Sequence, residues 1–190
     1  MYYLEFGMNR GAGEGSMELY QAQKHDFARI VHFYQNVIGK TIGMSDFCRW
    51  SYDDYPTDDL LIAHIQQGDM YLVEQDGEIL SALVLLPYQE ENFTWGIPWN
   101  VELEDGDVAT VHLLCVNPRM QRKGIASRTM GAAIRKARDM GKKAVRLDTL
   151  ACNLPARRLC ASLGFTEVEA VRWDFSNVGL TDIVLYEYLL

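Results

Sequence analysis

The sequence predicts an α/β fold: a mixed, largely antiparallel central sheet of about six or seven strands with helices on both faces. Strand-like and helix-like apolar patterns follow one another in the order β-α-α-β-β-β-α-β-α-β-β. The turn Asp76-Gly77 between two apolar runs is a hairpin signal. A third observation is the strand, tight turn and helix start that occupy residues 111–126.

Length and composition favour one domain. A chain of 190 residues with 48% hydrophobic content has ample apolar material for a single core, and we expect that domain over residues 17–190. Residues 1–16 end in a polar, Gly-rich segment that is typical of a flexible leader or tag. The four cysteines stand in apolar or helical settings without metal-type pairing, so we expect reduced thiols and no metal site.

The net negative charge of the chain limits which classes of binding partner are expected. A net charge of −8 and a pI near 5.0 argue against a nucleic acid or an anionic membrane as the main partner. This charge suits a small cationic substrate, although an acidic surface kept for solubility explains it equally well. The sequence has no apolar run of about 18 residues and no basic-then-apolar N-terminal signal, so we expect a cytoplasmic protein.

The first half of the chain predicts strand, helix, helix and hairpin. A short strand over 18–22 precedes a helix that Gly39 or Gly43 can end. The next helix starts at Asp58-Asp59, whose charges complement the helix dipole. The hairpin strands follow over 70–74 and 79–86.

The second half alternates strand and helix before a closing pair of strands. A strand over 111–116 leads to a helix over 124–140, which the run Gly141-Lys142-Lys143 ends. A strand over 145–149 and a helix over 153–163 follow, with Pro155 in the first turn, where its missing N–H is tolerated. Residues 168–175 and 183–189 form an antiparallel pair across a turn at 176–181.

The turn that precedes the helix at residue 124 has the properties of a phosphate cradle. Asn117-Pro118 breaks the strand, and the first N–H groups of the following helix have no intrahelical partner. Gly124 and Ala126 carry little or no side chain, so a phosphate can approach the main chain closely. Arg122 and Lys123 add positive charge. A glycine at a helix start is as often only a turn device, so this pattern alone leaves both interpretations open.

Two motifs resemble the GNAT N-acetyltransferase superfamily. The run Gln121-x-x-Gly124-x-Ala126, after a strand ending Leu114-x-Val116-x-Pro118, is similar to that family's acetyl-coenzyme A signature. The run Asn153-x-x-Ala156-x-x-Leu159-x-x-x-Leu163-Gly164-Phe165 resembles the family's next strand-to-helix unit, at the expected distance downstream. The resemblance covers roughly residues 108–165 and implies a GNAT-like sheet and acetyl transfer to a primary amine.

The resemblance also implies how acetyl-coenzyme A, the co-substrate, is held without a metal. Backbone groups of Leu114, Cys115 and Val116 would hold the pantetheine and the acetyl carbonyl. Asn153 would cap its helix and contact the pantetheine arm. The pyrophosphate would lie on the turn and helix start formed by Gln121, Arg122, Lys123, Gly124, Ile125, Ala126 and Ser127.

His112 is the candidate general base. An alkyl ammonium has a free pKa of about 10.4 and must lose a proton before it attacks. His112 lies four residues before Val116, where many family members carry a glutamate or another polar group, and strand alternation places it on the face of Leu114 and Val116 if no bulge intervenes. A hydrogen-bonded structural histidine explains it equally well. Acids of the preceding segment could act through water instead: Glu102, Glu104 and Asp107.

The sequence departs from the family pattern at Cys160. Many members carry a tyrosine there, after the residue equivalent to Leu159, and that tyrosine is proposed to protonate the leaving thiolate. Cysteine is shorter, with an unperturbed pKa of about 8.5, so it would need a tighter geometry or a bridging water. A structural, buried cysteine is the simpler interpretation, and Tyr186 or Tyr188 on the last strand is an alternative donor.

Aromatic residues in two segments are candidates for acceptor binding. Residues 47–56 carry Trp50, Tyr52 and Tyr55, in the part of the chain that lies over the acceptor site in the resembled family. The long loop over 88–104 carries Trp95 and Trp99 together with Glu90 and other acids. Packing at the edge of the core explains both segments equally well.

The leading hypothesis is an enzyme that acetylates a small primary amine. One alternative is acetylation of a protein or peptide amine. Another is a non-catalytic acyl-coenzyme A sensor, which the missing tyrosine makes less remote. The helices and exposed strand edges of such a domain would allow a homodimer, although no residue pattern specifies one.

Overall fold

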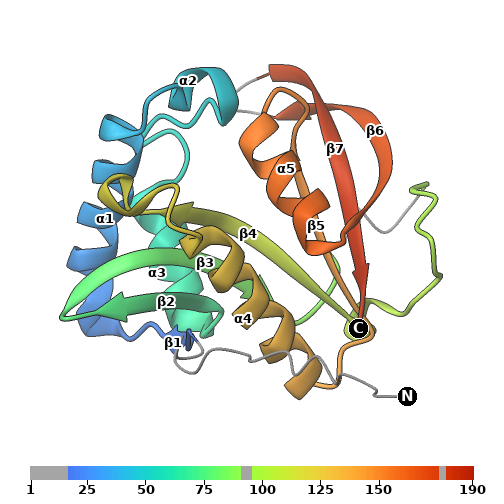
Figure 1. Cartoon of the computed structure of the whole chain (residues 1–190), viewed down its shortest axis with the longest axis horizontal. Coiled ribbons are helices and arrows are strands. Elements are labelled where there is room, and N and C mark those ends of the chain that lie inside the picture. Colours follow the sequence, from blue (N-terminus) through green and yellow to red (C-terminus); the bar gives the residue numbers. More distant parts are fainter. Residues whose placement is uncertain (1–16, 91–95, 176–178) are drawn as a thin grey trace, which may run out of the picture.

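The computed structural model describes residues 17–90, 96–175 and 179–190, so the expected leader and Trp95 lie outside the described residues. A seven-stranded sheet has the strand order β1-β2-β3-β4-β5-β7-β6 (Figure 1). The β4–β5 pair is parallel, and every other neighbouring pair is antiparallel. The predicted mixed, largely antiparallel α/β fold is therefore confirmed.

The elements follow the predicted order, with one additional helical turn, α2. The strands are β1 (Tyr20–Gln21), β2 (Met70–Gln75), β3 (Glu78–Leu86), β4 (Val108–Val116), β5 (Ala144–Leu150), β6 (Thr166–Phe175) and β7 (Gly179–Leu189). The helices are α1 (Phe27–Lys40), α2 (Met44–Phe47), α3 (Asp58–Gln67), α4 (Ile125–Asp139) and α5 (Leu154–Leu163). The last strand starts at residue 179 rather than 183, so the expected turn at 176–181 is too long. Among the described residues, no helix is long and apolar enough to cross a membrane.

Helices cover both faces of the sheet, as the apolar patterns predicted (Figure 1). On one face, α1 and α3 pack on β2, β3 and the end of β4 through buried residues such as Ile30, Leu61 and Val84. On the other face, α4 and α5 pack on β3, β4, β5 and β7 through residues such as Met130 and Cys160. Burying a large apolar side chain contributes about 1.5–3 kcal/mol, so these two clusters stabilise the arrangement of the helices around the sheet.

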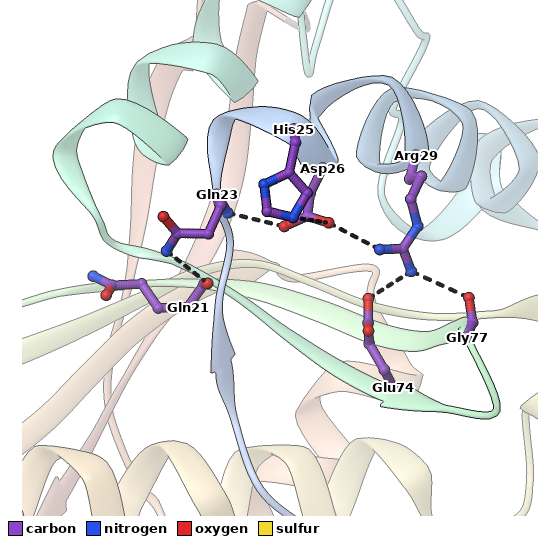
Figure 2. Close-up of polar contacts among 7 residues, drawn as sticks. All are labelled: Gln21, Gln23, His25, Asp26, Arg29, Glu74 and Gly77. Atoms are coloured by element: carbon purple, nitrogen blue, oxygen red, sulfur yellow. Dashed lines mark hydrogen bonds and ion pairs between the residues drawn. The ribbon is translucent and has the colours of Figure 1, made fainter.

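The start of α1 is fixed to the β2–β3 hairpin by Arg29 (Figure 2). Its guanidinium lies 2.8 Å from Asp26 Oδ1 and 2.7 Å from Glu74 Oε1, and it also donates to the carbonyl of Gly77 at 3.1 Å. Asp26 in turn accepts from the backbone N–H of Gln23 at 3.0 Å, at the start of the helical segment. The planar guanidinium joins two elements because it carries five donors in a fixed geometry.

The sheet forks between its two parallel strands. β4 and β5 pair only at Val108↔Ala144, Ala109↔Val145 and Thr110↔Arg146, although β4 continues to Val116 and β5 to Leu150. The strands diverge beyond these pairs (Figure 1). Thr110 and Arg146 are therefore the last closed rung, and His112 and Asp148, two residues further along each strand, lie just beyond it.

A β-bulge in β4 lies at the fork. Ala82 pairs with Cys115 and Val84 pairs with His112, so Leu113 and Leu114 together oppose the single residue Leu83. Leu113 has a φ of 53°, in the left-handed region that a leucine rarely adopts. The hydroxyl of Tyr34, from α1, donates to the Leu113 carbonyl at 2.9 Å. This buried hydrogen bond satisfies a backbone oxygen of the bulge.

Candidate active site

The predicted phosphate cradle has the backbone geometry that a phosphate site requires. Gly124 is the N-cap of α4 with φ 74°, and a Cβ built on it meets nothing within 4 Å. Arg122 is also left-handed, with φ 62°. The first backbone N–H groups of α4, which have no intrahelical partner, therefore begin beside a residue with no side chain and open space around its Cα. The turn leaves room for a phosphate group to approach the main chain.

The rest of the turn is arranged around this helix start. Asn117 accepts from Arg119 N at 3.1 Å and donates to the Ile79 carbonyl at 3.3 Å, so its side chain fixes the end of β4 to β3. Gln121 Nε2 donates to Thr41 Oγ1, at the end of α1, at 3.1 Å. The predicted pyrophosphate residues differ in exposure: Gln121, Arg122, Lys123 and Gly124 are exposed, Ala126 and Ser127 are half-buried, and Ile125 is in the core.

The predicted pantetheine residues lie beside the fork. Leu114 and Val116 are half-buried on the α4 side, whereas Cys115 is buried on the α1 side, where burial raises its thiol pKa. Asn153 caps α5, accepting from Ala156 N at 3.2 Å, and its amide donates to Cys48 Sγ at 3.3 Å. The β5–α5 turn therefore lies against the segment that follows α2.

The bulge changes the face on which His112 lies. Without it, His112 would share a face with Leu114 and Val116, as the sequence argument expected if no bulge intervened. Because directly opposed residues of antiparallel strands share a face, the pairing with Val84 places His112 on the side of α1 and α3. Leu114 and Val116 contact the clusters of the α4 side. The shared-face expectation is therefore wrong, because the bulge adds a residue to β4.

His112 lies between two carboxylates. Its Nε2 is 2.7 Å from Glu90 Oε2, and its Nδ1 is 3.9 Å from Asp148 Oδ1. At 2.7 Å, His112 Nε2 and Glu90 Oε2 are close enough to form an ion pair when His112 is protonated. The side chains of His112 and Asp148 are 19% and 18% exposed, and that of Glu90 is 35% exposed. The three groups form a recessed cluster with one edge open to solvent.

His112, Glu90 and Asp148 shift one another's pKa values. Burial lowers the pKa of His112, but Glu90 and Asp148, with Asp69 further off, outweigh burial and leave the pKa raised above 6.5. Burial raises the pKa of Glu90, but His112 outweighs it, so the net pKa is lowered. For Asp148, burial and the charge of Glu90 raise the pKa against the opposing effect of His112. A second pair, His64 Nδ1 and Asp69 Oδ1 at 2.9 Å, lies on the same side.

Three aromatic rings stand beside this cluster. The ring centroids of Trp50 and Tyr55 are 5.9 Å apart, and those of Tyr34 and Trp50 are 6.4 Å apart. Burial, with the charges of Asp148 and Glu90, raises the pKa of Tyr55. The hydroxyl of Tyr52 donates instead to Asp58 at the start of α3.

Other predicted site residues lie elsewhere. The ring of Trp99 packs on the guanidinium of Arg146, with the charge 4.1 Å from the ring centroid. Asp107 Oδ2 is 2.7 Å from Lys143 Nζ, and Glu102 and Glu104 are exposed. None of these contacts brings the residues to His112.

None of the three candidate acids has a side chain that is free at the fork. Cys160 is 2% exposed within the cluster under α4 and α5, and burial raises its pKa to about 12. The Tyr186 hydroxyl accepts from Arg157 Nε at 3.2 Å and donates to Glu167 Oε2 at 2.9 Å. Tyr188 packs against the same cluster, and its hydroxyl accepts from Arg138 Nη2 at 3.5 Å. These contacts favour structural roles for all three residues.

Sequence reasoning missed the partners of His112. Glu90 is only one of several acids in a long loop, and Asp148 lies within a strand. Nothing in the sequence marks Tyr34 of α1 as the residue whose hydroxyl supports the bulge. The period-two pattern of β5 contained a signal for Asp148, because a carboxylate between Leu147 and Thr149 on a buried strand needs a partner.

Comparisons with known proteins agree with this geometry. The model of the Acetyltransferase (GNAT) family matches residues 39–165, which is more than half of the chain. A search of curated protein sequences found no match.

Solved structures share the fold at low sequence identity. A GNAT family acetyltransferase from Streptococcus agalactiae has a TM-score of 0.77 and 16% identity, covering 95% of this chain and 99% of its own. A putative acetyltransferase from Salmonella typhimurium, solved with its cofactor acetyl-CoA, has a TM-score of 0.66 and 20% identity, covering 92% and 94%. The ribosomal-protein-S18-alanine N-acetyltransferase from Escherichia coli has a TM-score of 0.62 and 19% identity, covering 90% and 92%. The chain thus belongs to the GNAT acetyltransferase family, and it is an acyltransferase that uses acetyl-coenzyme A.

Proposed function

We propose that the protein acetylates a primary amine of a small molecule, and that His112, paired with Glu90, takes the proton from that amine. The observation that carries the proposal is the 2.7 Å contact between His112 Nε2 and Glu90 Oε2 at the opening of the fork. A carboxylate that holds one ring nitrogen of a histidine stabilises the imidazolium that forms when the other nitrogen accepts a proton, and the nearest Asp148 oxygen lies 3.9 Å from Nδ1, beyond hydrogen-bond distance.

The amine nitrogen forms a bond to the acetyl carbon as the bond from that carbon to sulfur breaks, and the coenzyme A thiolate that leaves would take its proton from solvent. Co-substrate binding and removal of the amine proton have residues that suit them. Acetyl-coenzyme A supplies the acyl group as a thioester. The cradle at Gly124 and the N-terminus of α4 would bind its pyrophosphate. His112 would accept the amine proton, and Glu90 and Asp148 would stabilise the imidazolium that forms. Because Glu90 is 35% exposed, the pair has a route by which the proton can reach solvent.

The surroundings of His112 support a small cationic acceptor. Glu90 and Asp148 offer negative charge, and the rings of Trp50 and Tyr55 offer faces that attract a cation. The net charge of the chain, −8, is also negative and therefore also attracts a cation. His112 and Asp148 are each about one fifth exposed, and this recess favours a slender amine over a broad protein surface. A peptide amine is the alternative acceptor.

The test is release of coenzyme A thiol from acetyl-coenzyme A in the presence of polyamines, aminoglycosides, amino acids and short peptides. Release that depends on a small amine supports the proposal, whereas turnover of peptides alone would show that the acceptor is a peptide amine instead. Bound coenzyme A without turnover of any amine would instead favour a sensor.

A matched pair of substitutions tests the role of His112. His112→Ala should reduce kcat on the order of 10²–10⁴-fold without weakening coenzyme A binding. The control is His25→Ala, because the His25 side chain is 80% exposed and remote from the fork. Equal rates for the two variants would exclude His112 as the base.

A further inference from the structure

Three consecutive loop residues run alongside the fork. Tyr88, Gln89 and Glu90 follow β3, and each contacts a different strand residue. The Tyr88 carbonyl accepts from Thr110 Oγ1 at 2.8 Å, and Gln89 Oε1 accepts from Arg146 at 3.3 Å. Glu90 then meets His112 at 2.7 Å. The loop therefore contacts the last closed rung, Thr110 and Arg146, immediately before it reaches His112, two residues further along β4.

Arg146 joins the loop to the sheet at two places. Its guanidinium donates to Glu187 Oε1 on β7 at 3.0 Å, to Gln89 Oε1 at 3.3 Å and to the Val101 carbonyl at 2.9 Å. The ring of Trp99 covers its face at 4.1 Å. Arg146 thus holds both the beginning and the later part of the loop.

These contacts are buried. Arg146, Glu187 and Gln89 are 3%, 1% and 4% exposed. A buried charge is costly unless it is paired and hydrogen-bonded, and Glu187 Oε2 has no hydrogen-bond partner among the described residues. A buried ion pair such as Arg146–Glu187 is therefore weak evidence that the cluster exists to stabilise the fold. The other donors of Arg146 bind loop residues Gln89 and Val101, which indicates that Arg146 positions the loop.

We infer that Arg146 is a positioning residue, which holds Gln89 and Val101 so that Glu90 lies against His112. The inference rests on the proposed function, because it gives Arg146 a role in the chemistry through the pair that accepts the proton. Arg146 touches neither His112 nor Glu90 in the contacts described, and it would act only through the loop.

Arg146→Lys is the direct test. Lysine keeps the positive charge for Glu187, but a single ammonium cannot reproduce the planar fork that also reaches Gln89 and Val101. Gln89→Leu is the second variant, since it removes the acceptor and leaves the Arg146–Glu187 pair intact. The matched control is Arg172→Lys, because Arg172 and Asp182 form an exposed cross-strand ion pair, 3.1 Å long, in the same sheet.

The primary readout is the NMR titration of the His112 ring in the full-length protein, assigned with His112→Ala. Groups that face His112 are Glu90 from the loop, Asp148 from β5 and Asp69 after α3, while His64 of α3 acts on Glu90. If Arg146 positions Glu90, both variants lower the pKa of His112 toward the value in Glu90→Gln, and Arg172→Lys does not. The kcat for the acceptor should fall on the order of 10- to 100-fold, as expected for a small misplacement, and its acid limb should move to lower pH.

Failure of this inference and failure of the proposed function look different. Folded Gln89→Leu or Arg146→Lys protein in which His112 titrates as in the wild type would overturn the positioning role, whatever the activity. A shifted titration in a protein that acetylates no amine would support positioning of Glu90 by Arg146 and would reject acetyl transfer by His112.

Discussion

His112 of β4 and Glu90 of the loop after β3 face each other, with 2.7 Å between Nε2 and Oε2. Their pKa values move apart: that of His112 is raised and that of Glu90 is lowered, because each stabilises the charged form of the other. Below the raised pKa the pair is an ion pair, and His112 becomes able to accept a proton only as the pH rises through that pKa.

Glu90→Gln tests this coupling. Loss of the carboxylate destabilises the imidazolium, so the pKa of His112 falls and the acid limb of the kcat/KM profile moves to lower pH. The plateau rate should also fall, because a weaker base accepts the proton less readily. Glu104→Gln is the control, since Glu104 is an exposed acid of the same loop. An acid limb that stays in place in Glu90→Gln would show that His112 does not set it.

Tyr34→Phe should destabilise the fold through the bulge. The substitution removes the only atom of the side chain that donates to the Leu113 carbonyl, and Tyr34 is fully buried. An unsatisfied buried carbonyl costs about 1–3 kcal/mol, to be measured as a shift of the urea midpoint at unchanged m-value. Tyr52→Phe, whose hydroxyl contacts Asp58 near the surface, should change stability by no more than about 0.5 kcal/mol. Equal midpoints for the two variants would contradict this account.

Gly124→Glu should weaken coenzyme A binding more than its matched control, Gly141→Glu. Both glycines are left-handed, with φ 74° and 73°, and a Cβ on either meets nothing within 4 Å. The backbone strain of roughly 1–2 kcal/mol is therefore common to both variants. Only Gly124→Glu would place a carboxylate at the N-terminus of α4, where the phosphates would bind. Calorimetric titration should show at least a roughly tenfold loss of affinity for Gly124→Glu alone; similar affinities would exclude this helix start as the cradle.

Cys160→Ala and Tyr186→Phe should spare catalysis. Cys160 is buried in the core, and the Tyr186 hydroxyl is bound between Arg157 and Glu167. We expect Cys160→Ala to lower the free energy of unfolding by about 1 kcal/mol, because it leaves a small cavity. Steady-state kinetics should give kcat values close to the wild type for both. A fall of more than about tenfold in either variant would identify that residue as the donor to the leaving thiolate.

Sequence patterns predicted the parts of the structure that depend on local signals. The order of strands and helices follows from apolar periodicity, and the Asp76-Gly77 turn fixed the β2–β3 hairpin. The left-handed Gly124 at the start of α4 was foreseeable, because glycine adopts that conformation without strain.

The acceptor side depended on long-range contacts that no local pattern records. The run Val111 to Val116 reads as a regular strand, and the bulge that turns His112 to the other face is visible only in its pairing with β3. Glu90 reaches His112 because Arg146 and Thr110, far along the chain, hold the preceding loop residues. The sequence therefore identifies a candidate residue such as His112 more readily than it identifies the residues that contact it.

The fork gives the sheet two additional edges, in its interior. Past Thr110 and Arg146, the facing sides of β4 and β5 present main-chain donors and acceptors that no neighbouring strand takes up in the described register. An unpaired edge is a template for any extended chain that carries amides. The pantetheine arm of coenzyme A is such a chain, so the placement beside Leu114, Cys115 and Val116 that the family resemblance implies would amount to strand addition inside the sheet. On that placement, the two half-sheets would be completed as one ladder only when the enzyme is loaded.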